Sequence, residues 1–348
     1  MVGPYFMRRQ HRLRAGSPSE VVPCNRRIYN SVPRGPAVGK ILFVGVTCVD
    51  VIINVDRLPR TAEDVIVYGQ QMALGGCAFN AFSIARALGV PAQLFSPVGT
   101  GAFGDYVRAN LAAEGIPVQV ENDECENGCC YCYVEPSGER TFVAYHGADY
   151  LYKREWFDAL DMDEIDMVYV CGLEIEDPTG AVIVDFLERR CADKTIFFTP
   201  GPRPDTLPMD LVERIYDLHP VLHMNGGEAI VSAARLGATE LVGGLAAVPE
   251  AVALLRRRVG NTVLATLGDR GCYYDSADGS GEVAGVRADV VDTIGAGDSH
   301  IGAVMACLQC GDALPAAIAC ANRVAAAVVA TAGAHLPSET VVQAAQGL

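Results

Sequence analysis

The sequence is short of positive charge. It has 27 Lys and Arg residues and 42 Asp and Glu residues, which gives a formal net charge of −15 over 348 residues. The isoelectric point is correspondingly low, at about 4.8. A chain that is acidic on average repels the phosphate backbone of nucleic acids. We therefore expect no nucleic-acid partner.

Long apolar runs are also missing, although 50% of the residues are hydrophobic. No run approaches the ~18 residues that a membrane span requires. The N-terminal region also lacks the apolar segment of a secretory signal. We therefore expect no membrane contact and a cytoplasmic location, with enough apolar residues to build a large core.

The first forty residues differ from the rest of the chain. They contain eight Lys and Arg residues but a single acid, Glu20, and they are rich in Pro and Gly without periodicity. That composition is typical of a disordered or loosely attached segment. We predict a basic arm over residues 1–39, whether a plain tail, an overlong start or a transit peptide. One folded domain over residues 40–348 would follow it.

Thirteen cysteines are present, but they do not repeat a zinc-finger spacing. Cys129 and Cys132 form one Cys-x-x-Cys, and a second pair, Cys307 and Cys310, falls within an apolar helical run. Cys130 and Cys132 alternate along an apparent strand, as small buried hydrophobic residues do. Reduced thiols are therefore the expectation, and a structural metal at residues 125–132 is the minor alternative.

The most informative segment is DTIGAGD, residues 292–298, which an Ala-rich helical run follows. Its two glycines let the backbone turn tightly with positive φ. The N–H groups of residues 295–297 would then converge at the positive end of the next helix, which is a site for an anion. Asp298 lies within this turn, where its carboxylate can take a proton from an attacking hydroxyl. The ordinary alternative is a helix N-terminus with a capping Asp.

A second segment, GGCAFN over residues 75–80, contains a Gly pair with Asn80 four residues after the second Gly. Together, and in this order, the two segments resemble the signatures of the ribokinase family of carbohydrate kinases, also called the phosphofructokinase-B family. The resemblance covers roughly Lys40 to the C-terminus. One residue departs from the pattern, because Cys77 stands where many relatives carry Lys or Asn. A sugar contact made at that position would be absent or altered here.

The resemblance implies an ATP-dependent kinase, a phosphotransferase with an alcohol group as acceptor. The γ-phosphate would pass to a primary hydroxyl of a small sugar, with Mg²⁺ bridging the phosphates. Asp298 would be the base, and Gly295, Ala296 and Gly297 would form the anion hole. Two alternatives stay open: a nucleoside kinase of the same family, and a non-catalytic sugar-binding relative. Relatives of the latter kind typically lose the loop Asp or its glycines, which are intact here.

Four residues are candidates for the acceptor side of the site. Asp50 follows the first strand between apolar neighbours, and the resemblance assigns its position to sugar hydroxyls, which a carboxylate can bind in pairs. Gly76 lets the backbone approach a ligand, and Asn80 offers a donor and an acceptor to a polyol. Arg140, just after a predicted turn, is a candidate for contact with phosphate or substrate. The structural alternatives are a solvent-facing Asp, a strand end, a helix start and a solvated Arg.

The nucleotide candidates follow predicted strands in the C-terminal half. Asn225 and Glu228 match the family's Asn-x-x-Glu, which organises Mg²⁺ and phosphate through water; the alternative is a capped helix start. The remaining candidates for contact with the phosphates, the nucleotide or the adenine are Thr266, Gly268, Gly271, Arg203 and Asn322.

A second ion is also implied. Ribokinase-like members hold a monovalent cation behind the anion hole, and Asp292 and Ile294 fit that pattern. K⁺ is therefore a candidate beside Mg²⁺.

Strand-like and helix-like segments alternate over most of the chain. Short apolar runs typical of buried parallel strands occur at residues 41–46, 167–171, 195–198 and 221–224, and helical segments follow several of them. This alternation predicts an α/β fold with a doubly wound, mostly parallel sheet and helices on both faces. Ligands would bind at the carboxyl ends of the strands.

A small β-sheet is predicted in addition. Extended segments at about residues 50–74 and 118–145 would form a lid whose closure excludes water from the site. Residues 93–98 read as one further strand. An apolar lid sheet could pair with a second copy, so a homodimer is the favoured assembly.

Overall fold

The structure, a computed structural model, describes residues 39–137, 139–176, 178–238, 241, 244–331, 333 and 335–348. The predicted basic arm therefore lies outside the described residues, apart from Gly39. Across the described parts of the chain, no helix is both long and apolar enough to cross a membrane.

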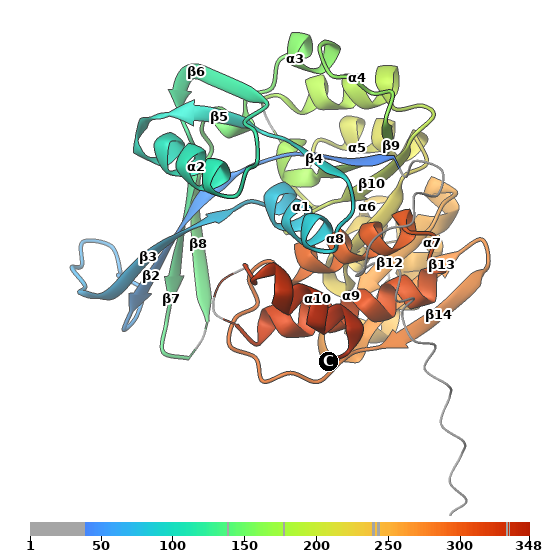
Figure 1. Ribbon diagram of the computed structural model, residues 1–348. Coiled ribbons are helices and arrows are strands. Elements are labelled where there is room, and N and C mark those ends of the chain that lie inside the picture. The colour runs from blue at the N-terminus through green and yellow to red at the C-terminus, as the bar shows by residue number, and fades with distance from the viewer. Residues whose placement is uncertain are drawn as a thin grey trace, which may run out of the picture.

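An eight-stranded sheet forms the centre of the body (Figure 1). Its first six strands pair in parallel, and the last two, β13 and β14, are antiparallel. Ile41, Leu42 and Phe43 in β1 are fully buried, because a strand covered on both faces has no solvent side. The order is β4 (Ala92–Phe95), β1 (Lys40–Val44), β9 (Ile165–Cys171), β10 (Thr195–Thr199), β11 (Val221–Asn225), β12 (Val263–Thr266), β13 (Gly271–Ser276) and β14 (Gly279–Ala284).

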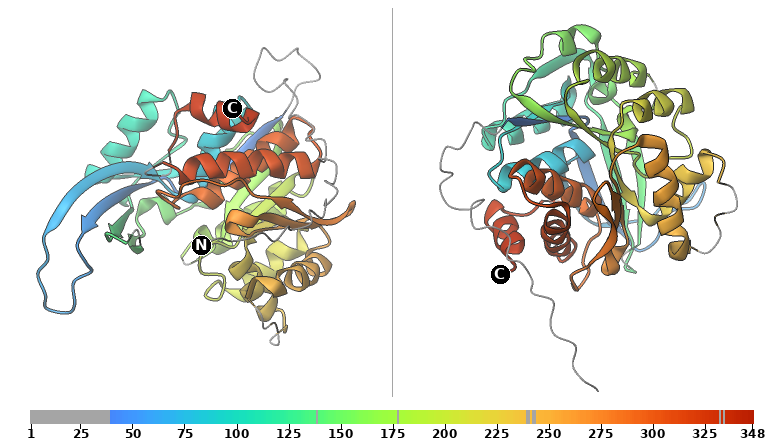
Figure 2. Two further views of the ribbon diagram at one scale, coloured as in Figure 1. Left: turned by 90° about the horizontal axis from the view of Figure 1, so that it is seen from below. Right: turned by 90° about the vertical axis from the view of Figure 1, so that its right-hand side faces the viewer.

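Helices cover both faces of this sheet, as the alternation predicts (Figure 2). The strands send alternate side chains to two separate apolar clusters: Phe43 packs with one helix layer, and Leu42 with the other. The first layer consists of α1 (Cys77–Ala87), α8 (Ala296–Gln309), α9 (Leu314–Val329) and α10 (Ser338–Gln346). The second consists of α3 (Arg154–Asp158), α4 (Gly180–Arg190), α5 (Met209–Asp217), α6 (Gly226–Arg235) and α7 (Val248–Val259).

A four-stranded sheet, called the lid below, projects from one end of the body (Figures 1 and 2). Its order is β3 (Val67–Gly75), β2 (Cys48–Val55), β7 (Cys129–Val134) and β8 (Arg140–Tyr145). The register aligns Asp50 of β2 with Cys130 of β7, and Cys130 with Ala144 of β8. Because side chains alternate along strands, Asp50, Cys130, Cys132 and Arg140 share one face of the lid.

The predicted strand over residues 93–98 is wrong in one respect. It divides into β4 of the large sheet and β5 (Pro97–Thr100), which pairs with β6 (Val120–Glu126) in a two-stranded sheet. The break falls at Ser96, directly before Pro97, which has no N–H to donate and begins β5. The side chain of Asn127 then accepts a hydrogen bond from the Gly99 N–H at 2.9 Å. The extended region from residue 118 therefore contributes to two sheets, and within that region only β7 and β8 belong to the lid.

Candidate active site

The DTIGAGD segment forms the turn into α8. Gly295 has φ 69° and is the N-cap residue, so a left-handed residue starts the helix. The Ser299 N–H donates to the Gly295 carbonyl at 2.8 Å. N–H groups of a first helical turn have no intrahelical acceptor, and a Cβ added to Gly297 would meet no atom within 4 Å. The start of α8 therefore has open space beside Gly297, as an anion site requires, although the Ala296 N–H also donates to the Thr293 carbonyl at 3.4 Å.

The GGCAFN segment lies directly against this turn. The Asn80 amide Nδ2 donates to Asp298 Oδ2 at 2.9 Å, across 218 residues of sequence. Close packing of α1 on α8 makes the contact possible: a Cβ on Gly302 would lie 2.3 Å from the Ala81 carbonyl oxygen. The two motifs that carry the family resemblance thus form one site.

The Gly pair before α1 is explained by two close approaches. Gly76 has φ 102°, and an added Cβ would lie 2.3 Å from the Val46 carbonyl oxygen. A Cβ on Gly75 would lie 2.1 Å from Asp50 Oδ2. Gly75 therefore leaves room for the Asp50 carboxylate, and Gly76 lets the chain turn from the lid into α1 beside it.

Three acids converge here, of which Asp50 and Glu174 are buried and Asp298 is half-buried, and their pKa values are raised. Burial raises the pKa of Asp298 from 3.8 to about 6, against the lowering effect of hydrogen bonds from Asn80 and Cys77. Burial, with the nearby charges of Asp298 and Asp292, raises the pKa of Asp50 from 3.8 to about 7. Negative charge is therefore costly in this region, and each carboxylate holds its proton more tightly than a solvated one.

Glu174 is the third of these acids, and sequence reasoning missed it. It follows β9 at the carboxyl edge of the sheet, and its Oε1 accepts the Val46 N–H at 2.9 Å. Burial raises its pKa from 4.5 to about 8. The available signal was its position directly after a buried parallel strand, where ligand-binding residues gather.

The nucleotide candidates gather around a cleft of about 340 Å³ at the carboxyl ends of β11 and β12. This volume lies within the range of small-molecule sites. Four Gly and four Ala are among its seventeen lining residues, which leaves room near the chain. The predicted residues that line the cleft are Asn225, Thr266, Gly268, Gly271, Ala296, Gly297 and Asn322.

A neutral hydrogen-bonded chain forms the floor of this cleft. His300 Nδ1 lies 2.9 Å from His223 Nε2, and His300 Nε2 lies 3.1 Å from Asn322 Oδ1. The Asn322 amide donates onward to the Val283 and Ala284 carbonyls. Burial lowers the pKa of His300 to about 4, so the ring is neutral at pH 7. His300, two residues after Asp298, was not among the predicted site residues.

Two nucleotide candidates do not line the cleft and are hydrogen-bonded to other side chains. Arg203 makes a bidentate pair with Glu176, at 3.0 and 2.7 Å, and does not line the cleft. Glu228 forms a capping box with Asn225, in which it accepts from the Asn225 N–H and Nδ2 and donates its own N–H to Asn225 Oδ1. The capped-helix interpretation of Asn-x-x-Glu therefore describes its local geometry.

Arg140 reaches from the lid to Asp292, the first residue of the DTIGAGD segment. Its guanidinium forms an ion pair with Asp292, and their side chains are 11% and 4% exposed. The Ile294 N–H donates to Asp292 Oδ1 at 2.7 Å and the Gly333 N–H to Oδ2 at 2.6 Å. The Arg140 guanidinium thus pairs with the Asp292 carboxylate, at which the family resemblance implied a monovalent cation.

Comparison with known proteins identifies the family of this chain. The family model described as pfkB family carbohydrate kinase matches residues 38–341. The chain belongs to this family. Members named ribokinase are phosphotransferases. An uncharacterized sugar kinase of Escherichia coli, YegV, is 32% identical over 307 residues, which are 88% of this chain and 94% of that relative.

Solved structures of the ribokinase fold confirm the architecture. A nucleoside kinase of Methanocaldococcus jannaschii, an archaeal member of the ribokinase family, superposes with a TM-score of 0.72 at 20% identity, over 90% of this chain and 100% of that one. A fructokinase of Xylella fastidiosa with bound ATP has a TM-score of 0.72 at 20% identity, over 88% and 98%. The predicted fold of a large, mostly parallel sheet with a small separate sheet is therefore confirmed.

Proposed function

We propose that this pfkB-family kinase transfers the γ-phosphate of ATP to a primary hydroxyl of a small carbohydrate. The observation that carries the proposal is the Asn80–Asp298 hydrogen bond. It joins the GGCAFN segment to the DTIGAGD segment beside the cleft. The acceptor would lie between this pair and Asp50. ATP would occupy the cleft, with its phosphates directed at the start of α8.

The roles follow from the contacts. Asp298 would accept the proton of the attacking hydroxyl, since a base whose pKa is about 6 is ionised at neutral pH yet basic enough to act. The N–H groups of Gly295, Ala296 and Gly297 would stabilise the charge on the transferred phosphoryl group. Asp50, Asn80 and the backbone at Gly76 would orient the sugar. Because a kinase must exclude water as a competing acceptor, closure of the lid is part of the proposal.

Mg²⁺ would neutralise the phosphate charge as ATP binds. Glu228 fits a water-mediated role near it, because each carboxylate oxygen keeps a lone pair beyond its hydrogen bond to Asn225. Burial raises the pKa of Glu228, so a nearby cation would favour its ionised form.

Arg140 changes the proposal for K⁺. Asp292 already receives a guanidinium and two backbone N–H groups. We propose that Arg140 supplies the positive charge behind the anion hole, so that turnover needs no monovalent cation.

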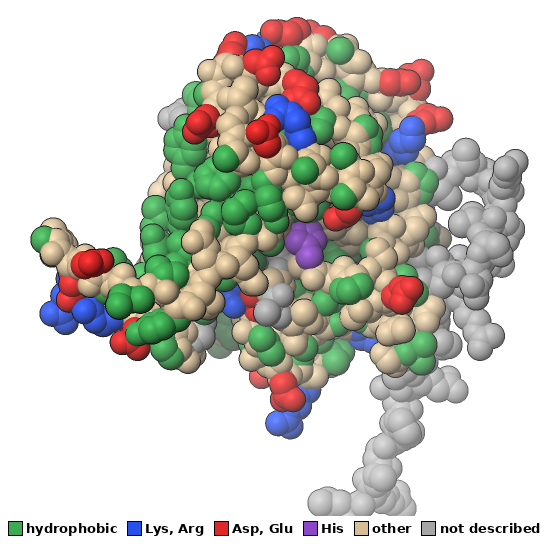
Figure 3. All heavy atoms as spheres, turned by 60° about the vertical axis from the view of Figure 1, so that its left-hand side comes forward, with side chains coloured by type: hydrophobic (Ala, Val, Ile, Leu, Met, Phe, Trp, Pro, Cys, Tyr) green, Lys and Arg blue, Asp and Glu red, His purple; other side chains and the backbone are tan. Residues whose placement is uncertain are grey.

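A homodimer through the lid remains part of the proposal. Exposed apolar side chains gather on the lid, and Figure 3 shows hydrophobic side chains spread over this side of the molecule. Phe142 is 54% and Val143 54% exposed, on the edge strand β8. Light scattering on the full chain would test the dimer, and Phe142→Ser should weaken it.

An ATP-consumption assay with sugars, sugar acids and nucleosides as acceptors tests the whole proposal. The Asp298→Asn variant is the inactive control. We expect turnover with a small sugar and a product phosphorylated at its primary hydroxyl. Turnover with nucleosides alone would favour the nucleoside kinase. Calorimetric sugar binding without turnover would favour the non-catalytic relative.

A further inference from the structure

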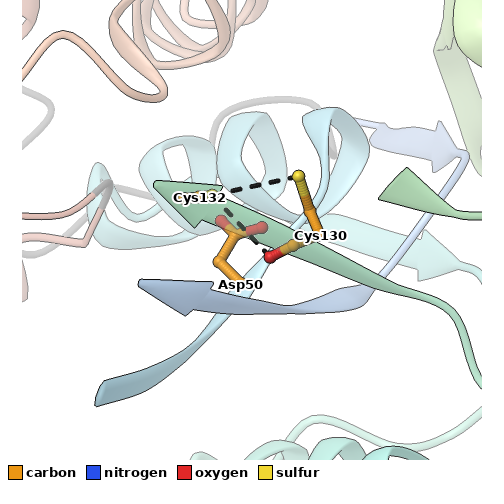
Figure 4. A group of neighbouring side chains, drawn as sticks. All are labelled: Asp50, Cys130 and Cys132. Atoms are coloured by element: carbon orange, nitrogen blue, oxygen red, sulfur yellow. Dashed lines mark hydrogen bonds between the residues drawn. The ribbon is translucent and has the colours of Figure 1, made fainter. Parts of the chain in front are cut away.

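The lid carries two thiols, those of Cys130 and Cys132, that the proposed kinase reaction does not use. Cys130 and Cys132 of β7 lie on the same face as Asp50 of β2, and the three side chains converge (Figure 4). One potential ligand atom from each lies within 4.8 Å of the other two. Asp50 and Cys132 are buried and Cys130 is half-buried. The three side chains are therefore largely shielded from solvent.

The structure also shows which cysteines pair. The sequence contains a Cys-x-x-Cys at Cys129 and Cys132, but alternation along β7 sends these two to opposite faces, and Cys129 packs in the apolar core. The pair on one face is instead Cys130 and Cys132. A fourth potential ligand, the Cys48 thiol, lies 4.0 Å from Asp50 Oδ1.

The spacing of the two thiols suits a tetrahedral thiophilic ion. Their sulfur atoms are 3.8 Å apart. With Zn–S bonds of about 2.3 Å and tetrahedral angles, two thiolates on one zinc ion lie about 3.8 Å apart. The two sulfurs therefore already stand at the edge length of a zinc–thiolate tetrahedron. The strand pairing between β2 and β7 holds the carboxylate beside them.

We propose that Asp50, Cys130 and Cys132 form a Zn²⁺ site on the inner face of the lid. The ion would take the two thiolates and the Asp50 carboxylate, and the two thiol protons would leave to solvent. Its fourth position would hold Cys48 or water. Because Asp50 is also the proposed acceptor ligand, bound Zn²⁺ would exclude the sugar; this last step rests on the proposed function.

Metal titration of the reduced, chelator-treated full chain tests the site without reference to activity. Co²⁺ should give thiolate-to-metal charge-transfer absorption, and Zn²⁺ should displace it at one equivalent per chain. Cys130→Ser and Cys132→Ser should each weaken Zn²⁺ binding by at least ~100-fold, since each loses a direct ligand. Cys125→Ser, on β6 outside the group, is the matched control and should bind as the wild type does. Equal binding by the Cys130→Ser/Cys132→Ser double variant would overturn the proposal.

A second measurement needs no variant and covers the case in which a substitution prevents folding. Zn²⁺ should slow alkylation of Cys130 and Cys132 in the wild-type chain, read by peptide mass spectrometry, and leave Cys125 unchanged. Identical alkylation rates at the pair with and without Zn²⁺ would rule the site out. Where kinase activity is measured, Zn²⁺ should inhibit competitively with the sugar. A chain without kinase activity that still shows the Co²⁺ spectrum would contradict the proposed function and leave the metal site standing.

Discussion

The nucleotide half and the acceptor half of the proposed site meet at Asp298 but are built from different chemistry. The nucleotide half is lined mostly by Gly, Ala and Val beside a neutral His300 network. The acceptor half contains buried acids with raised pKa values, Asp50 and Glu174, surrounded by thiols. A nucleotide brings its own negative charge and needs room and N–H groups. An uncharged polyol needs strong acceptors instead.

This difference has a consequence for charge. Acids so close to an incoming triphosphate would repel it if all were ionised. Their raised pKa values mean that, near neutral pH, Asp50 and Glu174 are partly protonated. The acceptor half can therefore be rich in carboxylates without carrying their full charge.

The largest expected effect comes from the residue where the halves meet. Asp298→Asn should keep the fold and ATP binding but lower kcat by about 10³-fold, because the base is lost. A coupled kinase assay with calorimetric ATP titration measures both. Asp289→Asn, an exposed carboxylate upstream of the same loop, is the control. Near-normal kcat in the Asp298 variant would refute its role as base.

The nucleotide half should be sensitive to bulk. Gly297→Ala adds a methyl where no protein atom lies within 4 Å. Stability should be unchanged. The kcat/KM for ATP should fall by about 10²-fold, because the methyl group would hold the phosphate away from the N–H groups, with an effect like the loss of one anion-hole donor. Gly302→Ala offers the contrast, since its methyl would meet the Ala81 carbonyl at 2.3 Å. It should cost about 1–3 kcal/mol of stability. Equal melting temperatures for both variants would contradict this reading of the helix start.

The link between lid and body should show in stability as well as in ion dependence. Arg140→Gln leaves Asp292 buried without its cation, which should destabilise the protein by about 3–5 kcal/mol in urea unfolding. The wild type should turn over equally in K⁺ and in tetramethylammonium buffers, and the variant should gain activity from K⁺. Strong K⁺ activation of the wild type would show that Arg140 does not replace the ion.

The smallest effect is a shift in the pH below which kcat/KM falls. The base must be ionised, so kcat/KM should be constant above the raised pKa and fall about tenfold per pH unit below it. Burial raises the pKa of Asp298 to about 6 and that of Asp50 to about 7, so this fall should lie between pH 6 and 7 and belong to the pair. Loss of activity only near pH 4, as for solvated carboxylates, would mean that neither Asp298 nor Asp50 controls the rate.

Several local features were predictable from short stretches of sequence. The DTIGAGD turn depends on Gly295, whose positive φ needs no distant partner. The strand and helix alternation follows from apolar runs such as residues 41–44, which are buried as predicted. The strand break at Ser96 was missed, because apolar residues stand on both sides of it.

Side-chain partners across the chain were not predictable. Arg140 was considered for substrate or solvent, and it pairs with Asp292, 152 residues away. Arg203 was expected near the phosphates and pairs with Glu176. A long charged side chain can reach many partners, and packing of the lid and loops selects one.

The sequence by itself determined the family, the α/β order and the two motifs, because each depends on backbone freedom and apolar period among neighbouring residues. Tertiary structure alone decided that Asn80 meets Asp298, that Glu174 joins the site, and that Cys130 rather than Cys129 faces Asp50. These outcomes depend on how strands and helices register in space, which no local stretch of the chain specifies.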